Sequence, residues 1–340
     1  MKKSCILMLV AIMATACQQK QTLPRQFNVS LEPHFDSVFL DVNGVTASDL
    51  HSLMVVQDGK VIYEKYGVGC RPDDLHIMWS ATKTFTALAA GFAWQDSLLD
   101  LNARLIDYLD PEQLPDSMSA ELQQVTIYHL LTMASGWEAD MITNRIRGHE
   151  QFNTIQEILH HPFRDVPGHQ WRYNNIDSYM LGVAIAQVTG MPMEDYLNQK
   201  LFTSLGIDDY YYQKDSEGYN TAAFGLYLTT ESLAKVGMLI LQKGEWQGKR
   251  LLSEEWLSMA MQPHTWQLRP DTTQTPTDWQ SGYGFQMWMC RQSGVVRMDG
   301  QWGQYAIIVP DKNAVVAMTT ICTDRNVQME AFWKYIYPNL

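Results

Sequence analysis

The sequence lacks the features that mark nucleic-acid-binding, membrane-spanning and metal-binding proteins. Its 340 residues include 25 basic and 37 acidic side chains, a net charge of −12, with no cluster of Lys and Arg. A nucleic-acid partner is therefore disfavoured. No apolar run reaches the about 18 residues that a spanning helix needs. The cysteines follow no zinc-ligand spacing and no HExxH segment occurs, so we expect no metal. No organic cofactor is implied either.

Cysteine is also scarce, with five residues in the chain. Beyond the N-terminal region only Cys70, Cys290 and Cys322 remain, an odd number for an exported protein. One disulfide with a free thiol and three buried thiols are both compatible with this count. The rest of the composition, with 46% hydrophobic residues, 21 Gly and 13 Pro, is that of a globular protein and excludes a fibrous or disordered chain.

The first 17 residues, MKKSCILMLVAIMATAC, are typical of a targeting segment. Lys2 and Lys3 precede an apolar stretch from Ile6 to Ala16, and Cys17 follows small residues, as in a bacterial lipoprotein signal whose Cys is lipidated after cleavage. We predict a lipoprotein-type signal peptide over 1–17, lipidation at Cys17 and a polar tether over 18–30. The protein would then be a bacterial cell-envelope lipoprotein, periplasmic or anchored at the outer membrane through this lipid alone. Simple secretion is the alternative.

The remaining residues, 31–340, are expected to form one domain with strands contributed by both ends. Two apolar runs around Asp58-Gly59 predict a hairpin over 51–66, and an apolar helix follows over 81–94. The region of about 97–245 is mostly helical in pattern, with helices starting at Thr126, near Asp177 and at Thr230 and ending at Gly136, Gly190 and Gly244. Strands return at 294–298, 304–309 and 314–321, followed by a helix at 327–336. The pattern predicts a layer of strands and helices closed by both ends, with a helical region inserted.

No GxSxG segment occurs. The nearest match, Met133–Trp137, lacks the first Gly, so the sequence does not support the nucleophile elbow of an α/β-hydrolase. The SxxK pattern occurs twice, at Ser80 to Lys83 and at Ser232 to Lys235. Ser80 precedes the apolar helix, and three-residue spacing places Lys83 on the same face one turn along, where burial favours a neutral amine that can act as a base. The second copy begins an amphipathic helix, and we expect Lys235 to be solvated. Without further motifs, Ser80 would be an ordinary N-cap.

A second candidate pair is Tyr173 and Asn175 in HQWRYNNIDSYMLG. Tyr173 follows a loop containing Pro167-Gly168 and directly precedes a helix, which suits a pair of loop-borne functional side chains. A phenol beside Lys83 can carry protons between the nucleophile and the leaving group. The amide of Asn175 can bind Lys83 and a substrate carbonyl. A half-buried aromatic residue beside a helix cap is the structural alternative.

The residues around these motifs resemble the serine β-lactamase-like family, which includes class C β-lactamases, DD-peptidases, related esterases and 6-aminohexanoate-dimer hydrolases. The similarity runs in order through MWSATKTFTALAAG, HLLTMASGW, RYNN, GLYLTTESLAKVGMLILQKGEWQGKRLLSEEW, SGYGFQMW and DGQWGQYAIIVP. The resemblance implies an α+β, β-lactamase/transpeptidase-like fold, in which an antiparallel sheet is flanked by helices. It also implies Ser80 as nucleophile, Lys83 as base, and Tyr173 as general acid/base together with Asn175.

The chain departs from the family at the third motif. Relatives carry Lys-Thr-Gly or His-Thr-Gly on the strand lining the site, and the matching stretch here is Met298-Asp299-Gly300. Gly300 would leave room for close backbone approach, and the N–H groups of Gln301 and Ser80 would form an oxyanion hole. Arg297 should point to the opposite face from Met298. The cation that meets a carboxylate is missing from the motif, and Asp299 would instead repel carboxylates and favour an amine.

The sequence thus predicts a serine hydrolase that cleaves an ester or amide bond of a small molecule through an acyl-enzyme. The pattern GQWGQYAIIVP is most similar to 6-aminohexanoate-dimer hydrolase and esterase relatives. The alternatives are a D-amino-acid peptidase or β-lactamase-like activity on cell-wall amides, and a binding protein that has lost turnover. Five tryptophans near the motif segments could wall an apolar cleft, although most are expected in the core. They are Trp79, Trp137, Trp171, Trp288 and Trp302.

Overall fold

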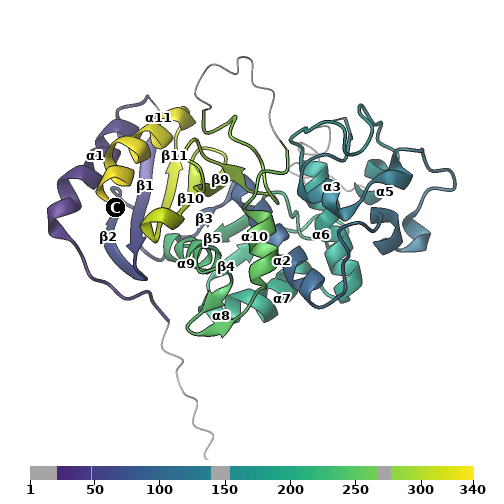
Figure 1. The fold of residues 1–340 in the computed structure, drawn as a ribbon, viewed down its shortest axis with the longest axis horizontal. Coiled ribbons are helices and arrows are strands. Elements are labelled where there is room, and N and C mark those ends of the chain that lie inside the picture. Colours follow the sequence, from purple (N-terminus) through teal and green to yellow (C-terminus); the bar gives the residue numbers. More distant parts are fainter. Residues whose placement is uncertain (1–20, 47, 139–153, 266–276) are drawn as a thin grey trace, which may run out of the picture.

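The computed structural model describes residues 21–46, 48–138, 154–265 and 277–340 (Figure 1). The predicted signal peptide and Cys17 lie outside the described residues. The described strands are β1 (Asp49–Gln57), β2 (Lys60–Tyr66), β3 (His76–Ile77), β4 (Tyr210–Tyr212), β5 (Leu226–Leu228), β6 (Glu245–Trp246), β7 (Lys249–Arg250), β8 (Trp288–Met289), β9 (Val296–Gly300), β10 (Gln304–Val309) and β11 (Ala314–Ile321). The described helices are α1 (Glu32–Asn43), α2 (Thr82–Gln95), α3 (Ile127–Leu131), α5 (Thr154–Leu159), α6 (Asn175–Thr189), α7 (Met193–Leu197), α8 (Thr203–Leu205), α9 (Thr230–Leu241), α10 (Glu254–Ala260) and α11 (Arg325–Ala331).

The main sheet joins the two ends of the chain. Its strand order is β2-β1-β11-β10-β9-β8, and each neighbouring pair is antiparallel. The predicted hairpin is confirmed as β1 and β2, and both turn residues take positive φ, 49° at Asp58 and 75° at Gly59, as a two-residue hairpin turn requires. Because β1 pairs with β11, the last strand of the chain is central and β9 lies toward one edge. The predicted antiparallel sheet with flanking helices is therefore confirmed.

Helices cover both faces of this sheet. Alternate residues of β1 enter two different hydrophobic clusters, Leu53 and Val55 with α1, and Met54 and Val56 with α9 and α2. This alternation is what a strand buried on both faces requires. Helices α1 and α11 lie side by side on one face (Figure 1). Helix α9 packs on the other face, so this part of the predicted inserted region belongs to the sheet layer.

The helical part of the molecule contains α3, α5 and α6 and lies beside the sheet (Figure 1). Helix α2 connects the two parts, because it contacts α6 on one side and β9 on the other. The predicted helix from Thr126 is shorter than expected: α3 ends at Leu131. There the Thr132 hydroxyl donates to the Tyr128 carbonyl at 2.8 Å and Met133 takes a φ of 58°, which stops the helical path.

The described part of the predicted tether is bound to the domain. Residues 24–28 run along β2, where the amides of Gln26 and Asn28 donate to the carbonyls of Val61 and Ile62 at 2.8 and 2.9 Å. Arg25 also forms ion pairs with Glu64 and Glu231 at 3.1 and 2.7 Å. The free chain between lipid and domain would therefore be shorter than residues 18–30.

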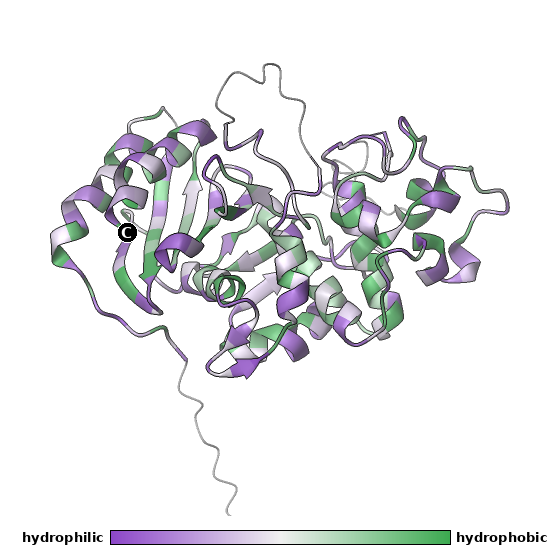
Figure 2. Ribbon diagram, in the orientation of Figure 1, coloured by the Kyte–Doolittle hydropathy of each residue, from purple (hydrophilic) through white to green (hydrophobic). Residues whose placement is uncertain are grey.

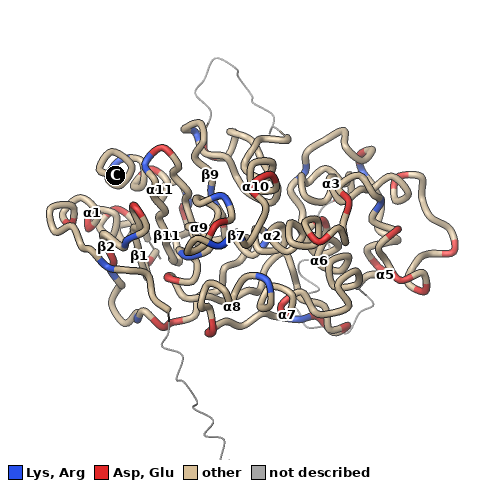
Figure 3. Tube along the Cα trace, turned by 60° about the horizontal axis from the view of Figure 1, so that its bottom comes forward, with Lys and Arg blue, Asp and Glu red and all other residues tan. Residues whose placement is uncertain are grey.

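Figure 2 shows the apolar residues running through the strands and the helices between the two parts, with hydrophilic residues on the loops. In the view of Figure 3, basic residues are scattered among acidic ones. Across the described ranges, no helix is long and apolar enough to cross a membrane, and no three His, Cys, Asp or Glu side chains are grouped as metal ligands. Cys70, Cys290 and Cys322 are free thiols, the last two buried.

Candidate active site

Ser80 lies in a single 3₁₀ turn, Trp79–Ala81, directly before α2. Trp79 has a φ of 46°, a left-handed conformation that is costly for a bulky residue, and residues strained in this way cluster at functional sites. The turn holds the Ser80 side chain half-exposed while the helix behind it is buried from Thr82 to Ala93. A serine hydroxyl is thus presented at the surface from a rigid support.

Lys83 follows one turn later and is 1% exposed. Its Nζ lies 3.3 Å from Ser80 Oγ, 2.6 Å from Asn175 Oδ1 and 2.8 Å from the carbonyl oxygen of Ala223. It also lies 5.0 Å from the ring centre of Tyr173. The predicted neighbours Ser80, Lys83, Tyr173 and Asn175 are therefore brought together, and Lys83 is within reach of the proton on Ser80.

Tyr173 and Asn175 are held at the start of α6. Asn174 caps that helix, because its Oδ1 accepts the amide N–H of Asp177 at 2.7 Å. Burial raises the pKa of the Tyr173 phenol well above its ordinary value, and the negative charge of Asp299 adds to the rise. A hydrogen bond with Ser80 acts in the opposite direction. Tyr173 is therefore a protonated phenol at neutral pH, which suits a proton donor.

A buried carboxyl group beneath this pair was not anticipated from the sequence. Asp177 is 0% exposed and its Oδ1 accepts the hydroxyl of Ser135, whereas its Oδ2 has no hydrogen-bond partner among the described residues. Burial raises its pKa to about 7, against the hydrogen bonds from Ser135 and Asn174 and the charge of Lys83. The Ser135–Asp177 contact ties the loop after α3 to the start of α6. It therefore supports the segment that carries Tyr173.

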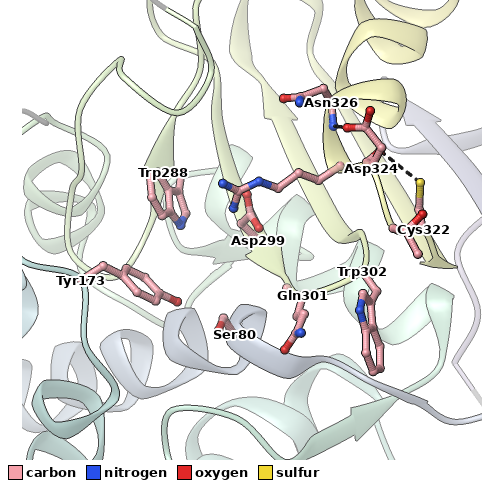
Figure 4. Close-up of a pocket in the computed structure, with 12 residues that line it drawn as sticks. Ser80, Tyr173, Trp288, Asp299, Gln301, Trp302, Cys322, Asp324 and Asn326 are labelled. Carbon is pink, nitrogen blue, oxygen red and sulfur yellow. Dashed lines mark hydrogen bonds between the residues drawn. The ribbon is translucent and has the colours of Figure 1, made fainter. Parts of the chain in front are cut away.

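The third motif forms the opposite wall. A Cβ on Gly300 would lie 2.2 Å from the carbonyl oxygen of Met78, so only glycine allows β9 to approach the turn that carries Ser80. This is the role predicted for Gly300. Gln301 follows at the end of β9 and lies across from Tyr173, with Ser80 between them (Figure 4).

Asp299 is held by an ion pair rather than left free for an amine. Its Oδ2 lies 2.8 Å from Nε of Arg297, which is on the same face of β9 two residues earlier. Arg297 is 0% exposed and its guanidinium lies over the rings of Trp279 and Trp288, 4.3 and 5.5 Å from their centres. The negative charge of Asp299 is therefore largely balanced from behind, which argues against the predicted amine preference.

Ser80, Tyr173, Asp299, Gly300 and Gln301 open into one pocket of about 650 Å³ (Figure 4). Two of the tryptophans noted in the sequence, Trp288 and Trp302, line it, whereas Trp137 is fully buried elsewhere. The remaining wall, which sequence reasoning missed, is the stretch from β11 into α11: Cys322, Thr323, Asp324, Arg325 and Asn326.

The second SxxK pair does not form a comparable site. Lys235 is 3% exposed, contrary to the expectation that it is solvated. Its Nζ donates to the carbonyl oxygens of Gln21 and Gly206 at 2.5 and 3.2 Å. The Ser232 hydroxyl accepts from Thr229 at 2.9 Å in the helix cap. Lys235 therefore fixes the N-terminal segment to α9, and Ser232 belongs to the cap of that helix.

The antiparallel sheet with flanking helices has the β-lactamase/transpeptidase fold, and a buried lysine lies beside a serine at the start of α2. The sequence profile of the Beta-lactamase family matches residues 46–336. The chain belongs to this family of serine hydrolases.

Individual relatives are distant. A 6-aminohexanoate-dimer hydrolase from Paenarthrobacter ureafaciens is 20% identical over 289 residues, 78% of this chain and 71% of that protein. A putative D-alanyl-D-alanine carboxypeptidase from Escherichia coli O157:H7 is 21% identical over 179 residues, 46% of this chain and 41% of that protein. The structure of a putative 6-aminohexanoate-dimer hydrolase from Bacillus anthracis superposes with a TM-score of 0.74 at 17% identity, over 94% of this chain and 87% of that one. At these identities the structural likeness establishes the fold.

Proposed function

We propose that this protein is a serine hydrolase that cleaves ester or amide bonds of small molecules through an acyl-enzyme formed on Ser80. The observation that carries the proposal is the position of Lys83, a buried amine with its Nζ 3.3 Å from Ser80 Oγ. A serine is a weak nucleophile unless an adjacent group removes its proton. The amide-hydrolase names of the relatives support the same reaction class.

In the first step, the neutral form of Lys83 accepts the Ser80 proton while Ser80 Oγ bonds to the substrate carbonyl carbon. The carbonyl oxygen becomes an oxyanion, for which the backbone N–H groups of Ser80 and Gln301 are the proposed donors. Asn175 and the Ala223 carbonyl, at 2.6 and 2.8 Å from Lys83 Nζ, stabilise the ammonium that forms.

In the second step, Tyr173 protonates the leaving amine or alkoxide as its bond to carbon breaks, and its phenolate is reprotonated from Lys83. The raised pKa of Tyr173 favours its protonated form before this step. Water then attacks the acyl-enzyme with the same groups acting in reverse, releasing the acid and restoring Ser80.

A panel of substrates tests the proposal. Wild-type protein should hydrolyse p-nitrophenyl esters or a linear aminohexanoate dimer, and Ser80→Ala should reduce turnover by about 10³-fold or more. Ser232→Ala is the matched control, because it removes the serine of the other SxxK pair, and it should retain activity. Equal rates for wild type and Ser80→Ala would overturn the proposal and favour a binding protein. Rapid nitrocefin turnover would place the chain with β-lactamases instead.

We also propose that the protein is exported and lipid-anchored at Cys17, on the sequence pattern of residues 1–17. An alkyne-tagged fatty acid fed to bacteria expressing the full chain should label the wild type and not Cys17→Ser. Labelling of neither, with the protein recovered in the soluble envelope fraction, would favour simple secretion.

A further inference from the structure

The bound N-terminal segment limits where a lipid on Cys17 can meet the domain. Gln21 is held by its carbonyl oxygen, which accepts a hydrogen bond from Lys235 Nζ at 2.5 Å, and Leu23 is buried in the core. Residues 18–20 are all that separates Cys17 from this bound segment. Because a chain extends by at most about 3.6 Å per residue, Cys17 can lie no more than about 14 Å from Gln21. The connection between lipid and domain is therefore short.

The bound segment begins at one end of the main sheet. Gln21 lines the same surface hollow as Gly59, in the β1–β2 turn, and Gln242, at the end of α9. In that turn the amide of Asp58 donates to the carbonyl of Asn313, directly before β11, at 3.1 Å. In Figure 1 the described part of the chain begins at this lower end of the strands, whereas α11 lies at their upper end. We call the end marked by Gln21, Gly59 and Gln242 the attachment end.

The catalytic pocket lies at the opposite end of the sheet. Strand β11 begins at the attachment end, where Ala314 pairs with Gln57, and it finishes at Ile321, opposite Asp49. Cys322 follows directly and lines the pocket. The nine residues of β1 lie between the two ends, and they span about 26 Å at the usual rise of about 3.3 Å per residue. The strands therefore separate the pocket from the place where the lipid attaches.

Two exposed apolar side chains also lie at the attachment end. Phe27 and Val29 are 55% and 68% exposed, and they line a hollow together with Asp58 and Lys60 of the β1–β2 turn. Single exposed apolar residues are common on protein surfaces, but these two lie where the short connection brings the lipid. Apolar side chains beside a lysine are suited to the interface of a bilayer, where the apolar groups enter and the ammonium stays at the headgroups.

We infer that the attachment end rests on the bilayer that holds the Cys17 anchor, with Phe27 and Val29 in contact with it, so that the pocket faces away from the bilayer. This inference rests on the proposed lipid anchor and on the proposed hydrolase activity. It assigns a substrate class: soluble esters or amides of the surrounding aqueous compartment, rather than lipids of the bilayer to which the protein is attached.

Energy transfer to labelled lipids tests this orientation. The full-length lipoprotein is bound to preformed phosphatidylcholine vesicles that contain an acceptor-labelled lipid, and it carries a donor dye on one introduced cysteine. The donor sites are Gln242→Cys at the attachment end and Val68→Cys beyond the far end of β2, both exposed. Cys70, a half-exposed free thiol, is replaced by Ser in both proteins. The dye at Val68 should lie about 20 Å farther from the lipid surface, because the length of β2 separates the two ends.

A lengthened connection is the matched control. About 16 Gly and Ser residues inserted between Lys20 and Gln21 leave every contact of the domain in place and add a flexible chain about 22 Å long on average. The insertion should lower the transfer from Gln242→Cys and reduce the difference between the two donor sites. An unchanged difference would mean that the short connection does not set the orientation.

A pair of double substitutions tests the apolar contact. Phe27→Ser with Val29→Ser should lower the transfer from the dye at Gln242→Cys. Val68→Ser with Ile321→Ser makes similar changes at exposed apolar residues of the pocket end, and it should leave that transfer unchanged. Equal effects of the two double substitutions would remove Phe27 and Val29 from the proposed contact.

Equal transfer from the two donor sites of the bound protein, or higher transfer from Val68→Cys, would overturn the inference. The bound protein should also hydrolyse p-nitrophenyl hexanoate in solution as fast as the detergent-solubilised protein does, and a loss of this activity on binding would contradict an outward-facing pocket. Failures of the proposed function are seen separately. A protein that does not bind vesicles lacks the anchor, and equal hydrolysis by wild type and Ser80→Ala excludes the nucleophile.

Discussion

The buried carboxyl group of Asp177 allows a prediction whose size follows from its surroundings. Its folded-state pKa of about 7 lies about 3 units above the ordinary aspartate value of 3.8. The folded state therefore holds a proton that the unfolded chain releases near pH 4. The contribution of Asp177 to the free energy of unfolding is therefore fully present below pH 4 and is lost as the pH rises to 7. Each pKa unit corresponds to roughly 1.4 kcal/mol, so the total loss is about 4 kcal/mol.

Asp177→Asn removes this titration while keeping an oxygen that can accept the Ser135 hydroxyl. The stability difference between variant and wild type should therefore shift in favour of the variant by about 4 kcal/mol between pH 4 and pH 8. For a chain of this length the shift corresponds to roughly 6 °C in Tm. Any constant effect of the amide on packing, or of other buried groups, cancels in the pH dependence of this difference.

Thermal unfolding of both proteins at pH 4, 5, 6, 7 and 8 measures the effect. The matched control is Asp116→Asn, which makes the same change at an exposed aspartate, and the shift for Asp177→Asn is measured against it. A shift for Asp177→Asn that does not exceed that of the control would refute the reasoning, because it would mean that Asp177 titrates alike in folded and unfolded protein.

Two further changes address the reaction and the wall beside it. Tyr173→Phe removes the proton donor but keeps the ring near Lys83, so kcat for an amide substrate should fall about 10² to 10⁴-fold. The circular dichroism spectrum and Tm should stay near those of the wild type. Undiminished amide turnover would exclude Tyr173 as the general acid. Gly300→Ala places a Cβ 2.2 Å from the Met78 carbonyl, which should separate β9 from Ser80, destabilise the fold by about 1–3 kcal/mol and reduce kcat/KM about a hundredfold. Wild-type rates and Tm in that variant would show that β9 need not approach so closely.

The parts of this molecule that could be predicted from sequence are those set by local chemistry. The hairpin followed from Asp58-Gly59 between apolar runs, and the grouping of Ser80 with Lys83 followed from helical spacing. Gly300 was expected to allow close backbone approach, and it does so against Met78. In each case the residues that decide the structure are neighbours along the chain or belong to a motif with a known geometry.

The parts that were missed depend on contacts between distant segments. Lys235 was expected in solvent, but its partners are carbonyl groups of Gln21 and Gly206. Arg325 enters the pocket only because β11 pairs with β10 and returns the chain beside β9, which no local pattern encodes.

One missed contact did carry a signal. Arg297 and Asp299 are two residues apart on a strand and so share a face, which could have predicted their ion pair in place of an amine contact at Asp299. For Asp177 no such signal exists, because its partner Ser135 lies 42 residues away.

The central claim is that Ser80 is an activated nucleophile, and intact-protein mass spectrometry after treatment with a fluorophosphonate probe tests it most directly. The account predicts one adduct per chain, located at Ser80 by peptide mapping, retained in Ser232→Ala and absent in Ser80→Ala. Lys83→Met should slow the labelling by about 10³-fold or more. Absence of an adduct in the wild type, or an adduct that persists in Ser80→Ala, would contradict the account.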